Sequence, residues 1–249
     1  MKIISPTVKH PLVGTQNTAN REGWLKSTLL EIPHNCRILD AGAGELKYKN
    51  YCQHLDYVSQ DFGKYDGAGD SKGLHTGNWD QSKIDILSDI TCIPEAEASF
   101  DAIMCIEVLE HLPTPLLAIK EFERLLKPGG TLILTAPVCS LTHFAPYYFY
   151  SGFSQYFYAD CLEKAGFTIL QMVPNGNYFE FLAQELRRVK TIEYRYATKK
   201  RNLNKINKLL FELAKVYLLK YLNKLSQADK GSSELLCFGY HIKALKKPN

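Results

Sequence analysis

The stretch Arg37-Ile-Leu-Asp-Ala-Gly-Ala-Gly44 decides the fold, because a short apolar run passes directly into a turn with two glycines. The pattern predicts a buried strand before the turn and a helix after it. Glycines at such a turn let the backbone bend tightly and approach a ligand, and the first N–H groups of a helix can point at that ligand. This arrangement is typical of α/β folds that bind ligands at the carboxyl ends of parallel strands.

Six further apolar runs follow, with helix-like segments between them. They are too uniformly apolar for half-exposed antiparallel strands, whereas parallel strands are buried on both faces. The seven predicted strands are residues 37–40, 57–61, 84–87, 100–106, 131–136, 167–170 and 235–242. We predict helices over 115–126 and 159–165, the first ended by Lys127-Pro-Gly-Gly130. The fold class is therefore α/β, a doubly wound, mostly parallel seven-stranded sheet with a helical insertion before the last strand.

Two stretches interrupt this alternation within a predicted single domain over residues 1–249. Residues 138–158 follow the fifth strand and are rich in aromatic side chains, which predicts a loop covering the substrate side of the crevice. Residues 174–231 have the pattern of two helices, the later one over 203–225 with an apolar face. We interpret this second stretch as a cap.

The net charge of +4 is concentrated in one region. Residues 187–230 contain 13 Lys or Arg against three acids, a net charge of +10, so the rest of the chain carries −6. This distribution gives no support to a nucleic-acid partner for the core. For the basic helices three interpretations stay open: the solvated outer face of a cap, which we favour, a peripheral contact with anionic lipid through 203–225, and an RNA-contacting arm.

The cysteines and the hydropathy of the sequence indicate the cellular compartment of the protein. The seven cysteines are scattered and never spaced Cys-x-x-Cys, which argues against a disulfide framework and a structural zinc site. Residues 1–10 contain no apolar run suited to a secretory signal, and no segment approaches the roughly 18 apolar residues that a membrane span requires. The sequence predicts a cytoplasmic protein without a metal site, and leaves its oligomeric state open.

Acidic residues stand at the ends of the first four predicted strands, namely Asp40, Asp61, Asp89 and Glu107. Carboxyl ends of parallel strands share one sheet edge, so these carboxylates should converge on the crevice. Asp61 can accept hydrogen bonds from both hydroxyls of a ribose, and Asp89 from an exocyclic amine, although Asp89 suits the capping of a turn as well. Asp40 beside the glycines disfavours a pyrophosphate. A dinucleotide motif is also excluded, because Lys47 occupies its third glycine position.

Six segments, in this order and spacing, resemble the class I (Rossmann-like) S-adenosylmethionine-dependent methyltransferases, particularly the small-molecule group labelled type 11. They are Ile38 to Gly44, Asp61, Ser88 to Pro94, Ser99 to Ile103, Val108 to His111, and Leu126 to Pro137. The resemblance implies S-adenosylmethionine as cofactor, with Gly42 and Gly44 along its methionine part, Asp61 on the ribose, and Asp89 with Ile90 around the adenine. The full cofactor-binding set predicted here is Asp40, Gly42, Gly44, Asp61, Asp89, Ile90 and Glu107. Many members have a third glycine at the position of Leu46, so we expect a wider turn or a different helix start here.

Methyl transfer from a sulfonium requires alignment of donor and acceptor and exclusion of water, with a general base only for a hydroxyl or ammonium acceptor. His143, after the fifth strand, is the better candidate for that base. For His111, after the fourth strand, a role in building the loop is favoured over catalysis. Tyr147, Tyr148 and Tyr150 are predicted substrate contacts, because their rings and hydroxyls suit a sugar, phenol or lipid-like acceptor.

The sequence thus predicts an S-adenosylmethionine-dependent methyltransferase that acts on a small molecule, with O-methylation favoured over N- or C-methylation. Two alternatives stay open. One is a non-catalytic methyltransferase-like scaffold module, against which the intact glycines and acids argue. The other is a methyltransferase that acts on RNA or protein.

Overall fold

The computed structural model describes residues 11–74, 77, 79–197 and 205–248. The chain divides into two compact units. We call Arg21–Asn175 with Gly239–Asn249 the sheet unit, and Met1–Asn20 with Gly176–Phe238 the helical unit. Each is described by itself, and the predicted single domain over residues 1–249 stays a prediction.

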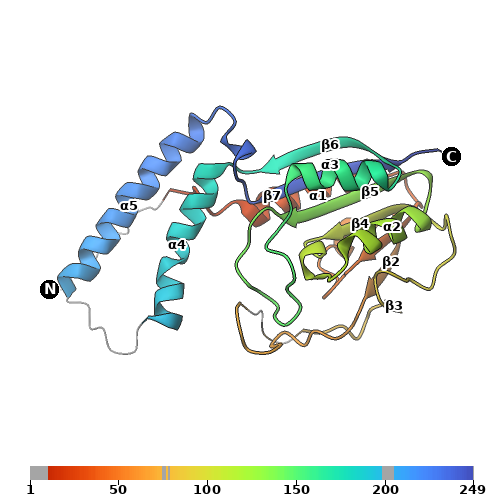
Figure 1. The fold of residues 1–249 in the computed structure, drawn as a ribbon, viewed down its shortest axis with the longest axis horizontal. Helices are drawn as coiled ribbons and strands as arrows, with labels where there is room; N and C mark the ends of the chain where they lie inside the picture. Colours follow the sequence, from red (N-terminus) through yellow and green to blue (C-terminus); the bar gives the residue numbers. More distant parts are fainter. Residues whose placement is uncertain (1–10, 75–76, 78, 198–204, 249) are drawn as a thin grey trace. The chain divides into compact units, whose positions relative to one another are not determined.

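The sheet unit is built on seven strands in the order β3-β2-β1-β4-β5-β7-β6 (Figure 1). Their bounds are β1 Arg37–Ala41, β2 Asp56–Asp61, β3 Ile86–Leu87, β4 Phe100–Ile106, β5 Leu126–Pro137, β6 Phe167–Asn175 and β7 Gly239–Lys246. The first five strands pair in parallel, and β7 runs antiparallel between β5 and β6. The doubly wound, mostly parallel seven-stranded sheet is therefore confirmed. The last strand begins four residues later than predicted and extends four residues further.

Three helices flank this sheet: α1 Asn17–Leu30, whose first turn belongs to the helical unit, α2 Pro115–Leu125 and α3 Gln155–Lys164. Helix α2 begins with a proline, whose missing N–H is no loss at that position, and ends before Gly129, which has φ +75°. Helix α3 begins at Ser154, whose side chain accepts a hydrogen bond from the N–H of Phe157, and ends before Gly166, with φ +84°. Both helices end before glycines that were predicted to stop them, whereas α3 begins four residues before its predicted start at residue 159.

The core of the sheet unit lies where α1 covers the central strands. Leu25 and Leu29 of α1 are fully buried and cluster with Ile38 of β1 and Met104 of β4. Burial of each such side chain contributes about 1.5–3 kcal/mol. This packing holds β1 and β4 side by side, which is where the order of the strands reverses and where open α/β sheets bind ligands.

The helix predicted after Gly44 is wrong. Residues 44–48 form successive turns that lead into the short 3₁₀ helix η1 Lys49–Tyr51. Leu46 has φ +59°, the left-handed conformation that glycine adopts without steric cost and leucine rarely adopts. The backbone thus makes a glycine-type turn at this position although the residue is leucine.

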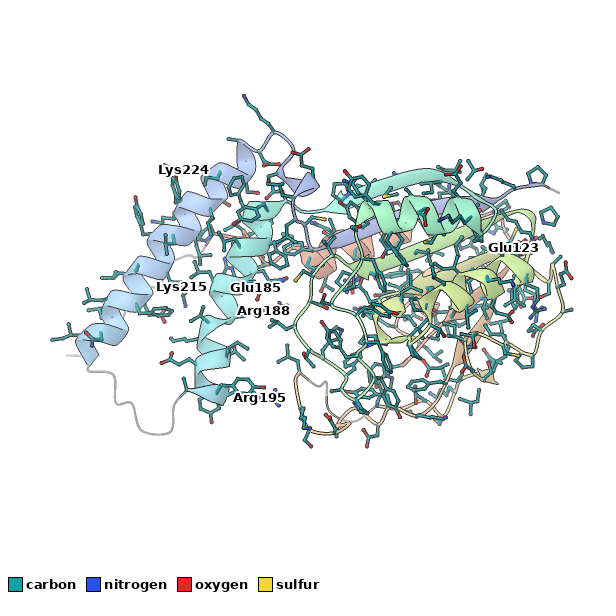
Figure 2. The ribbon with its side chains drawn as sticks, viewed as in Figure 1. Glu123, Glu185, Arg188, Arg195, Lys215 and Lys224 are labelled. Carbon is teal, nitrogen blue, oxygen red and sulfur yellow. The ribbon has the colours of Figure 1, made fainter. Side chains whose placement is uncertain are left out.

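The helical unit contains α4 Tyr178–Tyr196, α5 Lys205–Gln227 and the 3₁₀ helix η3 Ser232–Glu234, which confirms two helices in the insertion. Ala183 of α4 packs with Leu219 and Leu222 of α5 and with Val13. Basic side chains such as Lys215 and Lys224 extend from α5 (Figure 2). Among the described helices, none is both long and apolar enough to cross a membrane. Residues 1–10 and the start of the predicted 203–225 helix lie outside the described residues.

Candidate functional site

The glycine turn after β1 is tightly enclosed. Gly42 and Gly44 have φ +79° and +54°. A Cβ atom on Gly42 would lie 2.6 Å from a methyl carbon of Val108, and one on Gly44 would lie 2.7 Å from the ring of Trp79. Both positions therefore require glycine for conformation and for space.

The N–H groups of this turn are used within the protein. Those of Gly42 and Ala43 both donate to the carbonyl of Gln60 on β2, at 2.9 Å, and that of Gly44 donates to Asp61 Oδ2 at 3.0 Å. Because no α-helix starts here, the predicted set of unpaired helix N–H groups is not formed in the described turn. The turn is fixed by β2 before any ligand arrives.

Asp61 stands at the end of β2 and is almost fully buried. Its Oδ1 accepts hydrogen bonds from the backbone N–H of Gly63 at 3.0 Å and from Gln81 Nε2 at 2.7 Å. With the bond from Gly44, three donors hold this carboxylate in place. It is an oriented acceptor facing the space beside the glycine turn.

A cavity opens at the carboxyl ends of β1, β2 and β4, with about 640 Å³ of empty space including its mouth. Seven of the predicted site residues line it: Gly42, Gly44, Asp61, Ile90, Glu107, His111 and Tyr147. Five predicted residues are not among its lining: Asp40, Asp89, His143, Tyr148 and Tyr150. The mixture of apolar walls with a few polar groups is typical of a small-molecule site.

Aromatic side chains from two loops form one wall of the cavity. Tyr65 and Trp79, between β2 and β3, contact Phe144, after β5, with ring centroids 4.8 and 5.0 Å apart. Tyr147 meets Phe62 edge to face at 4.9 Å. The aromatic segment 138–158 thus reaches the cavity through Phe144 and Tyr147. The indole N–H of Trp79 is buried and has no hydrogen-bond partner in the described part of the chain.

Sequence reasoning missed eight lining residues: Gln60, Phe62, Tyr65, Trp79, Gln81, Val108, Leu112 and Phe144. Phe144 was in the segment singled out as aromatic, and Phe62, Tyr65 and Trp79 stand in the loop after Asp61. The only available indication was the aromatic content of that loop.

Asp40 and Asp89 make local contacts. Asp40 is buried and accepts a hydrogen bond from the Tyr57 hydroxyl at 2.6 Å. Burial, with a smaller contribution from the neighbouring Asp61, raises the pKa of Asp40 to about 7. Asp89 accepts from the N–H and the hydroxyl of Thr91, both at 2.8 Å, and these bonds lower its pKa. Asp89 therefore caps a turn, the structural alternative considered for it.

Glu107 joins the sheet edge to α1. Its Oε2 lies 3.0 Å from Arg21 Nη1, and its Oε1 accepts a hydrogen bond from the Thr135 hydroxyl at 2.9 Å. Both oxygens are thus engaged while the side chain lines the cavity. Glu107 also has φ +57°, a strained conformation of the kind that gathers at functional sites.

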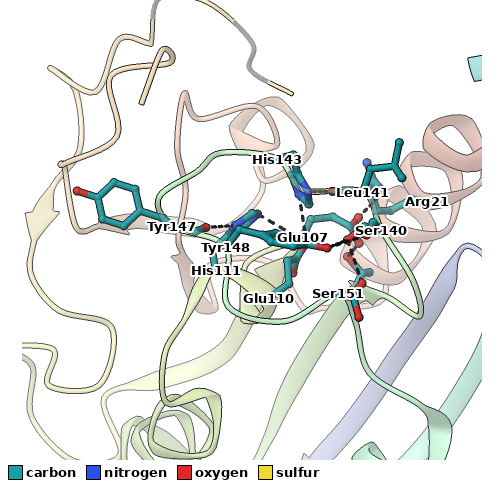
Figure 3. A network of polar contacts seen from close by, with 11 residues as sticks. Arg21, Glu107, Glu110, His111, Ser140, Leu141, His143, Tyr147, Tyr148 and Ser151 are labelled. Atoms are coloured by element: carbon teal, nitrogen blue, oxygen red, sulfur yellow. Dashed lines mark hydrogen bonds and ion pairs between the residues drawn. The ribbon is translucent and has the colours of Figure 1, made fainter. Parts of the chain in front are cut away.

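Glu110, His111 and His143 come together beside the cavity, and we call them the Glu-His cluster (Figure 3). His111 Nδ1 lies 2.6 Å from the Tyr147 carbonyl, and His143 Nδ1 lies 2.8 Å from the Leu141 carbonyl. Since a carbonyl only accepts, each Nδ1 carries the proton and each Nε2 carries a lone pair. The two Nε2 atoms lie 3.7 and 3.8 Å from Glu110 Oε1. His143 is outside the lining, but its ring contacts His111, which is part of it.

Burial disfavours charge in this cluster. It raises the pKa of Glu110 well above its usual range, with a further contribution from Glu107. Burial, with a smaller contribution from His143, lowers the pKa of His111 to about 4. Both carboxyl oxygens of Glu110 and Nε2 of His111 are buried without a hydrogen-bond partner among the residues that the structure describes. Such groups are rare in native proteins and point to a missing partner.

The other predicted substrate contacts belong to the loop itself. The Tyr148 hydroxyl donates to the Ser140 carbonyl at 2.6 Å, and the Tyr150 hydroxyl donates to the Pro113 carbonyl at 3.3 Å. The ring of Tyr148 also contacts His143, with centroids 5.2 Å apart. These two tyrosines shape the loop that carries His143 and Tyr147.

Comparison with known proteins gives a consistent picture. A family described as a methyltransferase domain matches residues 39–134. The chain is 56% identical over 41 residues to the ubiquinone biosynthesis O-methyltransferase of Xanthomonas campestris pv. campestris (strain B100), covering 16% of this chain and 17% of that protein. To the protein of the same name from Xylella fastidiosa (strain M23) it is 40% identical over 63 residues, 25% of each chain. The matched segments thus span a quarter or less of these relatives.

Solved structures share the fold over most of the chain. The [4+2]-cyclase SpnF is similar with a TM-score of 0.56 and 18% identity, covering 94% of this chain and 83% of that one. A SAM-dependent methyltransferase from Archaeoglobus fulgidus is similar with a TM-score of 0.54 and 14% identity, covering 93% and 95%. Since one of these is named a cyclase, the fold alone does not define the reaction. Residues 39–134 are therefore similar to the methyltransferase domain family, and the sheet unit has the same Rossmann-like fold as a solved S-adenosylmethionine-dependent methyltransferase.

Proposed function

We propose that this chain is an enzyme that transfers the methyl group of S-adenosylmethionine to a small-molecule acceptor. One observation carries this proposal: the glycine turn, Asp61 and Glu107 line the same cavity. The cavity lies where the order of the strands reverses, between β1 and β4. That is where open α/β sheets bind nucleoside ligands.

In this proposal Asp61 accepts the ribose hydroxyls. A carboxylate can accept about four hydrogen bonds, and the Asp61 carboxylate already accepts three. One acceptor position is therefore open to a ribose hydroxyl. A second becomes open if the Gln81 amide moves away. Gly42 and Gly44 line the cavity and would contact the methionine part, and Ile90 provides an apolar contact for the adenine. Asp89 would accept the adenine amine through Oδ2, because its bonds to Thr91 use Oδ1.

For Asp40 we propose a structural role and not the predicted contact with the cofactor. It is bonded to Tyr57 beneath the glycine turn and is absent from the lining of the cavity. We therefore assign to it the positioning of the turn. Glu107, which lines the cavity and is held by Arg21 and Thr135, is the second oriented carboxylate on the cofactor side.

The acceptor would lie between the aromatic wall and the Glu-His cluster. An acceptor oxygen attacks the methyl carbon, the O–H bond gives up its proton, and the sulfur keeps the electron pair of the broken S–C bond, which leaves S-adenosylhomocysteine. The histidines are the nearest groups able to handle that proton, and His143 is the more exposed of the two. The partial similarity to two O-methyltransferases supports an oxygen acceptor. The rings of Phe62, Phe144 and Tyr147 suit a phenol, sugar or lipid-like molecule.

A lipid-like acceptor would agree with the surface of α5. Exposed apolar side chains on this helix include Leu209, Leu213 and Tyr217, and the helix also contains Lys220 and Lys224. We keep peripheral contact with anionic lipid through 203–225 as part of the proposal. We likewise propose a cytoplasmic setting, in line with the scattered positions of the cysteines.

Calorimetric titration of the purified chain with S-adenosylmethionine and S-adenosylhomocysteine tests the proposal. We expect both to bind, and a methyl-release assay over sugars, phenols and lipids to find an acceptor. Absence of binding at high micromolar concentration would reject the enzyme proposal and favour a non-catalytic scaffold module. Binding without transfer to any small molecule, together with salt-dependent binding of RNA, would favour the RNA alternative.

A further inference from the structure

We propose that Glu110, His111 and His143 bind one divalent first-row metal ion, with Zn²⁺ as the reference ion, at the acceptor side of the cavity. The existence of this site is independent of the proposed function. Its purpose, to bind the acceptor oxygen, rests on that function.

The geometry is close to that of a metal site. One ligand atom from each of the three side chains lies within 4.8 Å of the others, and the Nε2 atoms are 3.7 and 3.8 Å from Glu110 Oε1. Ligands about 2.0–2.2 Å from a tetrahedral Zn²⁺ are about 3.3–3.5 Å apart. Small side-chain rotations are enough to bring the three atoms onto one ion.

Both imidazoles are already held in the tautomer that binds metals. Each donates its Nδ1–H to a backbone carbonyl, His111 to Tyr147 and His143 to Leu141, and so presents the Nε2 lone pair toward Glu110. Metal-binding histidines are commonly fixed by a hydrogen bond of this kind from the other ring nitrogen. A histidine that served only to fill space would need no such alignment.

Three buried atoms of Glu110 and His111 have no hydrogen-bond partner among the described residues. Glu110 is fully buried, and neither of its carboxyl oxygens has a hydrogen-bond partner there; Nε2 of His111 is in the same state. A buried carboxyl group without a partner destabilises the fold, so its presence calls for one. A single cation would satisfy these atoms together.

The donor set defines the class of ion. Two imidazole nitrogens and one carboxylate oxygen suit Zn²⁺ and its first-row neighbours better than Mg²⁺ or Ca²⁺, which prefer oxygen ligands. Three protein ligands leave at least one position open, the arrangement of catalytic sites. Of the three side chains, His111 lines the cavity, so the proposed ion would lie beside it.

The open position would bind the acceptor hydroxyl and lower its pKa, so that the oxygen attacks as its conjugate base. This deepens the proposed function, since it favours acceptors that coordinate a metal, such as phenols with a neighbouring oxygen or vicinal diols. In the metal-loaded protein His143 is a ligand and not a free base. The sequence predicts no metal site, because only Glu110 and His111 are adjacent and His143 joins them through folding.

The test is metal binding by the full chain after treatment with EDTA and its removal. We expect calorimetry to show one Zn²⁺ bound per chain. Co²⁺ should give the visible absorption of a low-coordinate site. The spectrum should lack thiolate-to-cobalt charge transfer, because that band would indicate cysteine ligands. The His143→Ala and Glu110→Gln variants should bind about 100-fold more weakly. His34→Ala, an exposed histidine outside the cluster, is the matched control and should bind as the wild type does.

Absence of a bound equivalent in the wild type, cobalt spectra of cysteine ligation, or equal affinity in His143→Ala would each overturn the proposal. Circular dichroism checks the fold of each variant, and His143→Ala decides if the buried Glu110→Gln variant does not fold. Binding of S-adenosylmethionine is measured on the same samples. Cofactor binding without metal binding rejects the metal site alone, whereas metal binding without cofactor binding rejects the proposed function alone.

Discussion

The two sides of the cavity differ in how their polar groups are satisfied. On the glycine-aspartate side, formed by Gly42, Gly44 and Asp61, the N–H groups of the turn and the carboxylate already bond to one another and to β2. In the Glu-His cluster, the carboxyl oxygens of Glu110 and Nε2 of His111 are buried without such bonds in the described chain. The glycine-aspartate side is thus organised without a ligand. The buried polar atoms of the Glu-His cluster, in our proposal, are satisfied only when a metal ion binds.

The largest expected effect concerns the Glu-His cluster. Removal of metal with EDTA should lower methyl transfer about 1,000-fold, because a metal contributes several kcal/mol to stabilising the developing charge and each 1.36 kcal/mol is a tenfold change in rate. Zn²⁺ or another first-row ion should restore the rate. A methyl-release assay measures the loss of activity and its recovery. Unchanged turnover of the metal-free protein would show that the Glu-His cluster needs no metal ion.

A second effect concerns the pH dependence of stability beneath the glycine turn. Burial raises the pKa of Asp40 from its ordinary value of 3.8 to about 7, so the folded state holds this proton more tightly than the unfolded state does. Stability should therefore fall as pH rises through this range, by about 3 kcal/mol between about pH 5 and pH 8.

Urea unfolding of the wild type and of Asp40→Asn at a series of pH values measures this effect. The variant cannot ionise and should show a flatter profile. A wild-type profile that rises with pH, or parallel profiles for the two proteins, would show that Asp40 is not held protonated by burial.

Asp61→Ala should weaken binding of S-adenosylmethionine by about 1.5–3 kcal/mol, because the charge-assisted hydrogen bonds to the ribose are lost. The same change also releases Gly44, Gly63 and Gln81. Calorimetric titration measures the affinity, and Asp61→Asn separates charge from shape. Unchanged affinity in Asp61→Ala would exclude Asp61 from the cofactor site.

The smallest effect is expected at Asp89. Asp89→Ala removes the cap on Thr91 and one predicted contact to the adenine amine, and should weaken cofactor binding by about 0.5–1.5 kcal/mol. Titration under the same conditions as for Asp61→Ala gives the ranking. A loss at Asp89 larger than that at Asp61 would reverse the assignment of the two carboxylates.

The comparison also explains which features the sequence could predict. The strands, the glycine turn and Asp61 depend on residues close together in the chain and on a periodicity that burial imposes, and they were predicted. The helix after Gly44 was wrong because Leu46 adopts a left-handed conformation that propensity does not indicate.

The rest of the site depends on tertiary contacts. Trp79 and Tyr65 reach the cavity because a long loop folds back onto Phe144, and no motif marks that loop. His143 was singled out, but its meeting with Glu110 depends on the path of the chain after β5. The engagement of Asp40 by Tyr57 depends on cross-strand register.

The most direct test of the central claim is titration of the purified chain with S-adenosylmethionine, first as isolated and then after removal of metal. We predict one molecule bound per chain with similar affinity in both samples, because the glycine-aspartate side is organised without the Glu-His cluster. Absence of binding in the metal-containing sample would contradict the account.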